Sequence, residues 1–177
     1  RLSDKKEYNM LDKKILNWYK ENRRDYPWRN TNNPFHVLIA ELFLQRTRSD
    51  NVENVYVKFI DEFKSPQDIV KADKNELMKY LSKLGLQNSR YKSIINISKE
   101  LINKYNGNVP DNIGALKSIN GVGGYIANAT LCFGYEQRVP IIDTNTKRWV
   151  QRYYGVHDND VIKEKLLDVL PEEDYVK

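Results

Sequence analysis

Residues 118–127 have the sequence Ser-Ile-Asn-Gly-Val-Gly-Gly-Tyr-Ile-Ala, in which a glycine-rich turn separates two segments of helical character. Gly121 and Gly123 suit such a turn, because glycine adopts backbone conformations that a side chain forbids. They also let a phosphate come close to the main chain, where the amides that begin the next helix favour negative charge. The Gly-x-Gly pattern alone fits a plain helix–helix turn equally well. Phosphate binding is therefore one of two interpretations of this turn.

Helical spacing of apolar residues continues on both sides of the turn. Predicted helices cover about residues 8–21, 33–45, 51–63, 73–84, 89–105, 111–118, 124–133 and 159–170, with others starting at Ser65-Pro66 and near Asp143. About ten short helices joined by tight turns, without a convincing strand hairpin or repeat, predict an all-α fold. We expect residues 33–133 to form one lobe that contains the turn. The two ends, 1–32 and 134–177, would pack together as the other lobe.

The composition fits a folded protein with a polyanionic partner. The 177 residues carry a formal net charge of +5, and the pI is about 9.1, although many small basic domains bind nothing acidic. No apolar run approaches the ~20 residues that cross a bilayer, and no signal segment opens the chain. The single cysteine, Cys132, excludes an internal disulfide and a cysteine-held zinc or iron–sulfur site within these residues. Arg1 is not an initiator methionine, so we expect a fragment of a longer intracellular protein.

The turn and a second segment together resemble a known family. Residues 141–150 have the sequence Ile-Ile-Asp-Thr-Asn-Thr-Lys-Arg-Trp-Val, an aspartate at a helix start followed by a basic helix. This pair of segments is similar to the two signatures of the endonuclease III and MutY superfamily of helix–hairpin–helix DNA glycosylases (HhH-GPD). The similarity extends from residues 25–29 (Asp-Tyr-Pro-Trp-Arg) to about Gly155. The Tyr-Pro-Trp-Arg segment, Arg-Tyr-Tyr-Gly at 152–155 and Tyr125 resemble the branch of Mig-type thymine–guanine mismatch glycosylases.

The resemblance implies a fold of two helical lobes with a DNA-binding cleft between them. Its one clear departure in the turn is Asn120, where the family usually has proline, and we expect a less rigid turn there. It also implies that the backbone carbonyls of Lys117, Ile119 and Val122 hold a monovalent cation, Na⁺ or K⁺, that bridges to a DNA phosphate. Most relatives carry a C-terminal iron–sulfur cluster held by four cysteines. These residues lack it, so the cluster is either truncated away or absent from this variant.

Asp143 and Glu41 are the two candidate catalytic acids. By position alone Asp143 is a helix N-cap. The resemblance assigns to it the carboxylate that stabilises the positive charge on the sugar and activates water, with Asn145 as a polar neighbour. Glu41 lies in a segment, 35–44, that is apolar on nearly every side, so we expect it to be buried. Burial raises the pKa of a carboxyl and suits it to donate a proton to a leaving base. The alternative for Glu41 is an ion pair with an arginine such as Arg29 or Arg46.

Tyr125 occupies the position at which bifunctional relatives carry a lysine that attacks the sugar. Tyrosine cannot form a Schiff base, so we expect base removal without efficient strand cleavage. The alternative is an amphipathic core tyrosine.

An enzyme that acts on a base must flip it out of the duplex and fill the space that it leaves. The resemblance assigns this filling role to Gln45 and to the apolar wedge Leu86. An ordinary loop role is the alternative for each. The other candidate DNA contacts are Gly121, Val122, Gly123 and Gly124 in the turn and the basic residues Arg46, Arg48, Lys147 and Arg148, which are otherwise merely solvated. His36 and His157 lie outside any metal-ligand motif in the sequence, so we interpret both as structural or surface residues.

The sequence therefore predicts a monofunctional glycosylase that removes thymine or uracil opposite guanine from double-stranded DNA. The first alternative is a MutY-like enzyme that removes adenine opposite 8-oxoguanine. The second is a non-catalytic hairpin module that only binds DNA, which would need neither Glu41 nor Asp143. We expect a monomer without membrane association, located in the cytoplasm of a prokaryote with the nucleoid.

Overall fold

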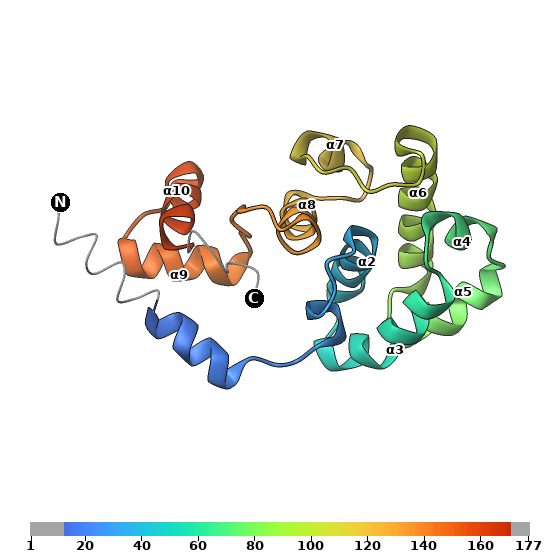
Figure 1. The fold of residues 1–177 in the computed structure, drawn as a ribbon, viewed down its shortest axis with the longest axis horizontal. Coiled ribbons are helices and arrows are strands. Elements are labelled where there is room, and N and C mark those ends of the chain that lie inside the picture. The colour runs from blue at the N-terminus through green and yellow to red at the C-terminus, as the bar shows by residue number, and fades with distance from the viewer. Residues whose placement is uncertain (1–12, 171–177) are drawn as a thin grey trace. The chain divides into compact units, whose positions relative to one another are not determined.

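A computed structural model describes residues 13–170 of the chain (Figure 1). Residues 13–22 are helical, and no strand occurs within the described range. The α-helices that follow are α2 (Pro34–Leu44), α3 (Ser49–Glu62), α4 (Pro66–Lys71), α5 (Lys74–Leu81), α6 (Gln87–Tyr105), α7 (Ile113–Ser118), α8 (Gly124–Ala129), α9 (Thr144–Tyr154) and α10 (Asn159–Val169). Two 3₁₀ turns, η1 (Pro27–Arg29) and η2 (Ser82–Leu84), and a π-helical turn, η3 (Thr130–Gly134), complete the order. The predicted all-α fold is confirmed, while residues 1–12 and 171–177, including the start of the first predicted helix, lie outside the described range.

Side-chain caps set several helix starts. Asn33 precedes Pro34, and its side-chain oxygen accepts hydrogen bonds from the amides of Phe35 and His36. Asp73 and Glu76 form a capping box at the start of α5. Two predicted helices are shorter than expected, because 73–84 divides into α5 and η2, and 124–133 divides into α8 and η3.

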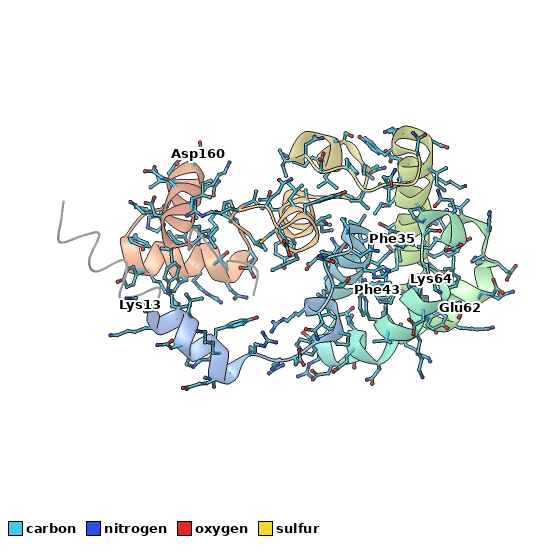
Figure 2. All side chains as sticks on the ribbon, viewed as in Figure 1. Lys13, Phe35, Phe43, Glu62, Lys64 and Asp160 are labelled. Carbon is cyan, nitrogen blue, oxygen red and sulfur yellow. The ribbon has the colours of Figure 1, made fainter. Side chains whose placement is uncertain are left out.

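The chain divides into two compact units, residues 26–137 and the two ends together. In the first unit α2 is the central element, and eight of its eleven residues are buried. It contacts α3, α8 and η3, so apolar side chains are required on nearly every face of the helix. Phe43, labelled in Figure 2, is fully buried in α2 and meets the ring of Phe59 in α3 edge-to-face at 4.9 Å.

Helix α6 is the longest of the described helices and packs against α4 and α5. Its buried face carries Ile94, Ile97 and Leu101 at helical spacing, and the same face includes the charged residue Arg90. The residues that flank this helix, Leu86 and Asn106, both have a left-handed backbone conformation.

The second unit contains α9 and α10, which contact each other and bury Val150 and Ile162. Arg138 donates hydrogen bonds to the carbonyls of Leu167 and Leu170 at the end of α10, each at 2.6 Å. Within residues 13–170, no helix of either unit is both long and apolar enough to cross a bilayer.

Candidate functional site

Glu41 is a buried acid in the middle of α2, with 5% of its surface exposed. Tyr125, the second residue of α8, forms a side-chain hydrogen bond with it. The carboxylate oxygen Oε2 is buried and has no hydrogen-bond partner among residues 13–170. Because a buried polar atom is rarely left without a partner, this oxygen can accept a hydrogen bond from a water or from a ligand.

Burial raises the pKa of Glu41 to about 7, and the hydrogen bond from Tyr125 opposes part of this rise. Arginines do not contribute to this shift, which leaves the alternative of an ion pair with Arg29 or Arg46 without support. The carboxyl is therefore divided between its acid and ionised forms near neutral pH, as a general acid requires. Tyr125 is 41% exposed, so its ring is only partly buried.

The glycine-rich turn links α7 to α8 and contains glycines of two kinds. Gly121 has a φ of 101°, and a Cβ atom added there would lie 3.1 Å from the Ser93 hydroxyl oxygen, so the turn requires glycine. Gly123 has a φ of −80°. A Cβ atom added at Gly123 or Gly124 would meet no atom within 4 Å. These two glycines are not required for packing, and they leave the main chain accessible to an anion such as a phosphate.

Helix α6 holds this turn through Asn120, the position at which the resemblance leads us to expect proline. The Asn120 amide donates to Glu100 Oε1 at 3.0 Å, and its carbonyl accepts from Asn96 Nδ2 at 3.3 Å. Lys104 in turn donates to Glu100 Oε2 at 2.6 Å, and this hydrogen bond is the largest cause that lowers the pKa of Glu100. Since proline has no amide hydrogen, the bond to Glu100 requires a residue other than proline at position 120.

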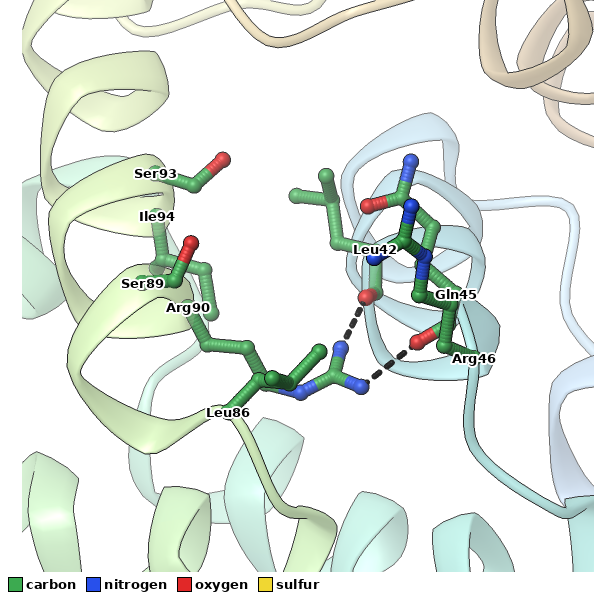
Figure 3. A pocket seen from close by; sticks show the side chains of 8 residues that line it. All are labelled: Leu42, Gln45, Arg46, Leu86, Ser89, Arg90, Ser93 and Ile94. Carbon is green, nitrogen blue, oxygen red and sulfur yellow. Dashed lines mark hydrogen bonds between the residues drawn. The ribbon is translucent and has the colours of Figure 1, made fainter.

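Two segments far apart in sequence meet at one pocket of about 450 Å³ (Figure 3). Gln45 and Arg46 follow the end of α2, and Leu86 precedes the start of α6. The structure therefore brings together Gln45 and Leu86, the two residues that were predicted to fill the space left by a flipped base. The pocket is completed by Leu42, Ser89, Arg90, Ser93 and Ile94. Leu86 is 57% exposed, as an apolar wedge must be to reach DNA.

Arg90 joins these two segments beneath the pocket. Its guanidinium donates to the carbonyls of Leu42 at 2.5 Å and Gln45 at 2.6 Å, and its Nε donates to the Gly85 carbonyl at 3.0 Å. It also donates to the Thr47 hydroxyl at 2.5 Å, and that hydroxyl donates to the carbonyl of Leu84. The side chain is buried, and burial lowers its pKa.

In the second unit, Asp143 is the N-cap of α9. Its Oδ1 accepts the Thr146 amide at 2.7 Å, and its own amide donates to the Thr146 hydroxyl at 2.8 Å. The oxygen Oδ2 has a longer contact, 3.4 Å, with the side-chain nitrogen of Asn145. The cap thus fixes the carboxylate through one oxygen and leaves the other for chemistry, so the two interpretations of Asp143 are compatible.

Asn145 is oriented by Arg148, whose guanidinium donates to Asn145 Oδ1 at 2.8 Å. Both residues line a second pocket of about 300 Å³ with Trp149, Arg152 and Tyr153. The rings of Trp149 and Tyr153 are stacked, with centroids 5.7 Å apart.

The four predicted phosphate-binding side chains differ in their surroundings. Arg46, Arg48 and Arg148 are exposed. Lys147 is less exposed and donates to Asn159 Oδ1 at 2.9 Å, so it links α9 to α10. Arg48 is the backbone N-cap of α3, without a side-chain cap.

The backbone carbonyls of Lys117, Ile119 and Val122 lie at the end of α7 and in the turn that follows it. Lys117 lies in the last turn of α7, where a helix leaves carbonyls unpaired. Ile119 accepts the Val122 amide at 3.0 Å, which leaves one lone pair of its oxygen. Among residues 13–170, no group of three or more His, Cys, Asp and Glu side chains could hold a metal ion.

Arg90, Thr47 and Glu100 were missed by the sequence analysis. A signal for Arg90 exists, because it precedes Ile94 and Ile97 at helical spacing and so lies on the buried face of α6. Thr47 and Glu100 leave no comparable signal, since their hydrogen-bond partners are distant in sequence.

Known proteins resemble this chain over most of its length. It is 36% identical over 141 residues to the thymine/uracil-DNA glycosylase of Methanothermobacter thermautotrophicus, covering 80% of this chain and 64% of that protein. It is 34% identical to the adenine DNA glycosylase of Mycobacterium tuberculosis H37Rv, covering 81% of this chain and 47% of that protein. A solved structure of a thermostable thymine-DNA glycosylase matches with a TM-score of 0.89 and 31% identity, covering 96% of this chain and 81% of the other.

The chain thus spans about two thirds of the first of these proteins and about half of the second. The family profile of the HhH-GPD superfamily base excision DNA repair proteins matches residues 39–172, which include the hairpin, the buried glutamate and the capping aspartate. The chain belongs to the HhH-GPD superfamily of base excision DNA repair proteins.

Proposed function

We propose that this chain is a monofunctional DNA glycosylase that hydrolyses the N-glycosidic bond of thymine or uracil opposite guanine. The observation that carries the proposal is Glu41, a buried acid with a pKa of about 7 and one oxygen that has no hydrogen-bond partner in the described part of the chain. A protein that only binds DNA has no need of such a group. The 36% identity to a thymine/uracil-DNA glycosylase supports the choice of base.

In the proposed reaction the bond between the sugar C1′ and the base nitrogen breaks, and its electron pair leaves with the base. The acid form of Glu41 donates a proton or hydrogen bond to the departing base. The ionised Asp143 stabilises the positive sugar and accepts a proton from the attacking water, whose oxygen binds C1′. Asn145, held by Arg148, orients this water or the sugar. Tyr125 holds Glu41 and offers no amine, so the strand stays intact.

The remaining site residues have proposed roles in binding a duplex with a mismatched or damaged base. Gln45 and Leu86 fill the space that the flipped nucleotide leaves. Gly121, Val122, Gly123 and Gly124 present backbone amides to a phosphate, and the carbonyls of Lys117, Ile119 and Val122 hold Na⁺ or K⁺ beside it. Arg46, Arg48, Lys147 and Arg148 contact other phosphates.

The proposed enzyme has two lobes. One covers about residues 33–133 and contains the hairpin, and the other consists of the two chain ends, 1–32 and 134–177. The protein would act as a monomer on chromosomal DNA in the cytoplasm of a prokaryote.

A MutY-like activity on adenine opposite 8-oxoguanine is the second candidate. The 34% identity to an adenine DNA glycosylase favours it, and Glu41 and Asn145 serve that chemistry equally well.

One experiment tests both activities. The protein is incubated with duplexes that contain T·G, U·G, A·8-oxoguanine or only normal pairs, and abasic products are cleaved with hot alkali. We expect products from T·G and U·G alone, and none with Asp143→Asn. Release of adenine would assign the MutY activity, and strand nicking without alkali would contradict the role of Tyr125. DNA binding without any abasic product would indicate a non-catalytic hairpin module.

A further inference from the structure

The rim of the larger pocket consists of two short segments in unusual backbone conformations. Arg46 has a φ of 56° and Leu86 has a φ of 51°, both left-handed, and Gly85 between η2 and Leu86 has a φ of 74°. Residues other than glycine keep such conformations only where their surroundings hold them in place. The question is therefore which contacts hold Arg46 and Leu86.

Arg90 makes these contacts for both segments at once. Its acceptors on one side are the carbonyls of Leu42 and Gln45 and the hydroxyl of Thr47. On the other side it binds the carbonyl of Gly85, directly before Leu86. Figure 3 shows the guanidinium below the pocket, between the end of α2 and the start of α6.

The chemistry of the group matches this task. A guanidinium carries five N–H donors in a rigid plane, whereas an ammonium is a compact charge with three rotating donors. Every acceptor of Arg90 in the described structure is a neutral oxygen. A buried charge with neutral partners is costly, so an apolar side chain would serve simple packing better.

We infer that Arg90 is a positioning residue that fixes the Gln45–Arg46 segment and the Leu86 segment as one rigid wedge for opening the duplex. The inference rests on the proposed function of the chain. Loss of this clamp would let the two segments move independently, so that less of the wedge would be preformed when the protein meets DNA. The bond-breaking step would be unaffected, since the hydrogen bonds from Arg90 end at the oxygens of Leu42, Gln45, Thr47 and Gly85 and include neither candidate catalytic acid.

The first test compares excision of uracil opposite guanine with excision of uracil opposite an abasic site, which has no partner to break from. Single-turnover rates are measured for the wild type and Arg90→Lys. Arg138→Lys is the matched control, because Arg138 also donates to two backbone carbonyls but lies in the other unit. We expect Arg90→Lys to lose about tenfold on U·G and less than about threefold opposite the abasic site. An equal loss on both substrates, or a loss matched by Arg138→Lys, would overturn the inference.

The second test needs no enzymatic activity, so it separates this inference from the proposed function. Backbone ¹⁵N relaxation dispersion is recorded on the free protein. In Arg90→Lys we expect new exchange at residues 45–47 and 85–87 together, with the amides of Gly121 and Val122 unchanged. Exchange at one segment alone, or at neither, would contradict the clamp. If Arg90→Lys does not fold, Thr47→Val removes a single acceptor of the clamp, and both measurements are made on that variant with the same expected directions.

Discussion

Arg90, near the start of α6, and Glu100, in its second half, each fix a neighbouring loop by hydrogen bonds to its backbone. Arg90 is buried and donates to two separate segments of the pocket rim. Glu100 is partly exposed and accepts a single backbone amide, that of Asn120 in the hairpin. Its second oxygen is bound to the exposed Lys104.

This difference separates the rim segments, whose conformation depends on contacts with another helix, from the hairpin, whose conformation depends on its own residues. The rim segments contain the left-handed residues Arg46 and Leu86, and the buried guanidinium binds the carbonyl of the residue directly before each of them. The hairpin already has its conformation from Gly121 and from the hydrogen bond between Val122 and Ile119. Glu100 therefore only tethers the hairpin, at a place where water competes for the same bonds.

The largest expected effect is the loss of the buried clamp. We expect Arg90→Met to lower the free energy of unfolding by about 4 kcal/mol, because it leaves several backbone oxygens without their donor. Glu100→Gln should cost about 0.5 kcal/mol, since the bonds that it weakens are partly solvated. Urea denaturation of both variants measures the two values. Similar losses of unfolding free energy in the two variants would contradict the difference between the buried Arg90 clamp and the Glu100 tether.

The next effect concerns pH, because the pKa values of Glu41 and Glu100, two glutamates of the same unit, are shifted in opposite directions. Burial raises the pKa of Glu41 from 4.5 to about 7. The protonated carboxyl therefore stabilises the fold fully at a pH below 4.5, and this stabilisation is lost as the pH rises through 7. A shift of this size corresponds to about 3 kcal/mol. Glu41→Gln should remove this dependence in unfolding measurements between pH 4.5 and 8.

Glu100 behaves in the opposite way, because the hydrogen bond from Lys104 lowers its pKa. Its small contribution is present above the ordinary pKa of a glutamate and is lost as the pH falls. The cost of Glu100→Gln should therefore be present at neutral pH and disappear at the acidic end. For Glu41, a free energy of unfolding of the wild type that does not change between pH 4.5 and 8 would contradict its burial.

A third effect separates two glycines of the hairpin. Gly121→Ala should lower the free energy of unfolding by about 2 kcal/mol, because alanine is strained at a φ of 101° and its Cβ would meet Ser93. Gly123→Ala should stay within about 0.5 kcal/mol of the wild type, since its φ is ordinary and the space is open.

The two variants also differ in what they report about DNA. Gly123→Ala should weaken binding to duplex DNA, measured by fluorescence anisotropy, although the protein remains stable. Unchanged binding by this variant would contradict an approach of the phosphate to Gly123.

The same contrast explains what could be predicted from the sequence. The hairpin, the cap at Asp143 and the burial of Glu41 follow from neighbouring residues, and the structure confirms these local features. The clamp could not be predicted, because the acceptors of Arg90 on the α2 side lie 43 to 48 residues away in the sequence. Only the folded chain shows that Gln45 and Leu86 share one pocket.

The smallest expected effect tests how little the tether contributes. Asn120→Pro removes the amide that Glu100 accepts, which costs about 0.5–1 kcal/mol. Proline also reduces the freedom of the unfolded chain by a similar amount, and Ile119 before it has an extended conformation that proline tolerates. We therefore expect the stability of Asn120→Pro to lie within about 0.5 kcal/mol of the wild type. In this background Glu100→Gln should cost less than in the wild type, since only the hydrogen bonds from Lys104 and Asn96 remain to be lost, and a double-mutant cycle by urea denaturation isolates the bond to the amide. If Glu100→Gln costs the same in both backgrounds, Glu100 acts through Lys104 or Asn96 and does not hold the hairpin by its amide.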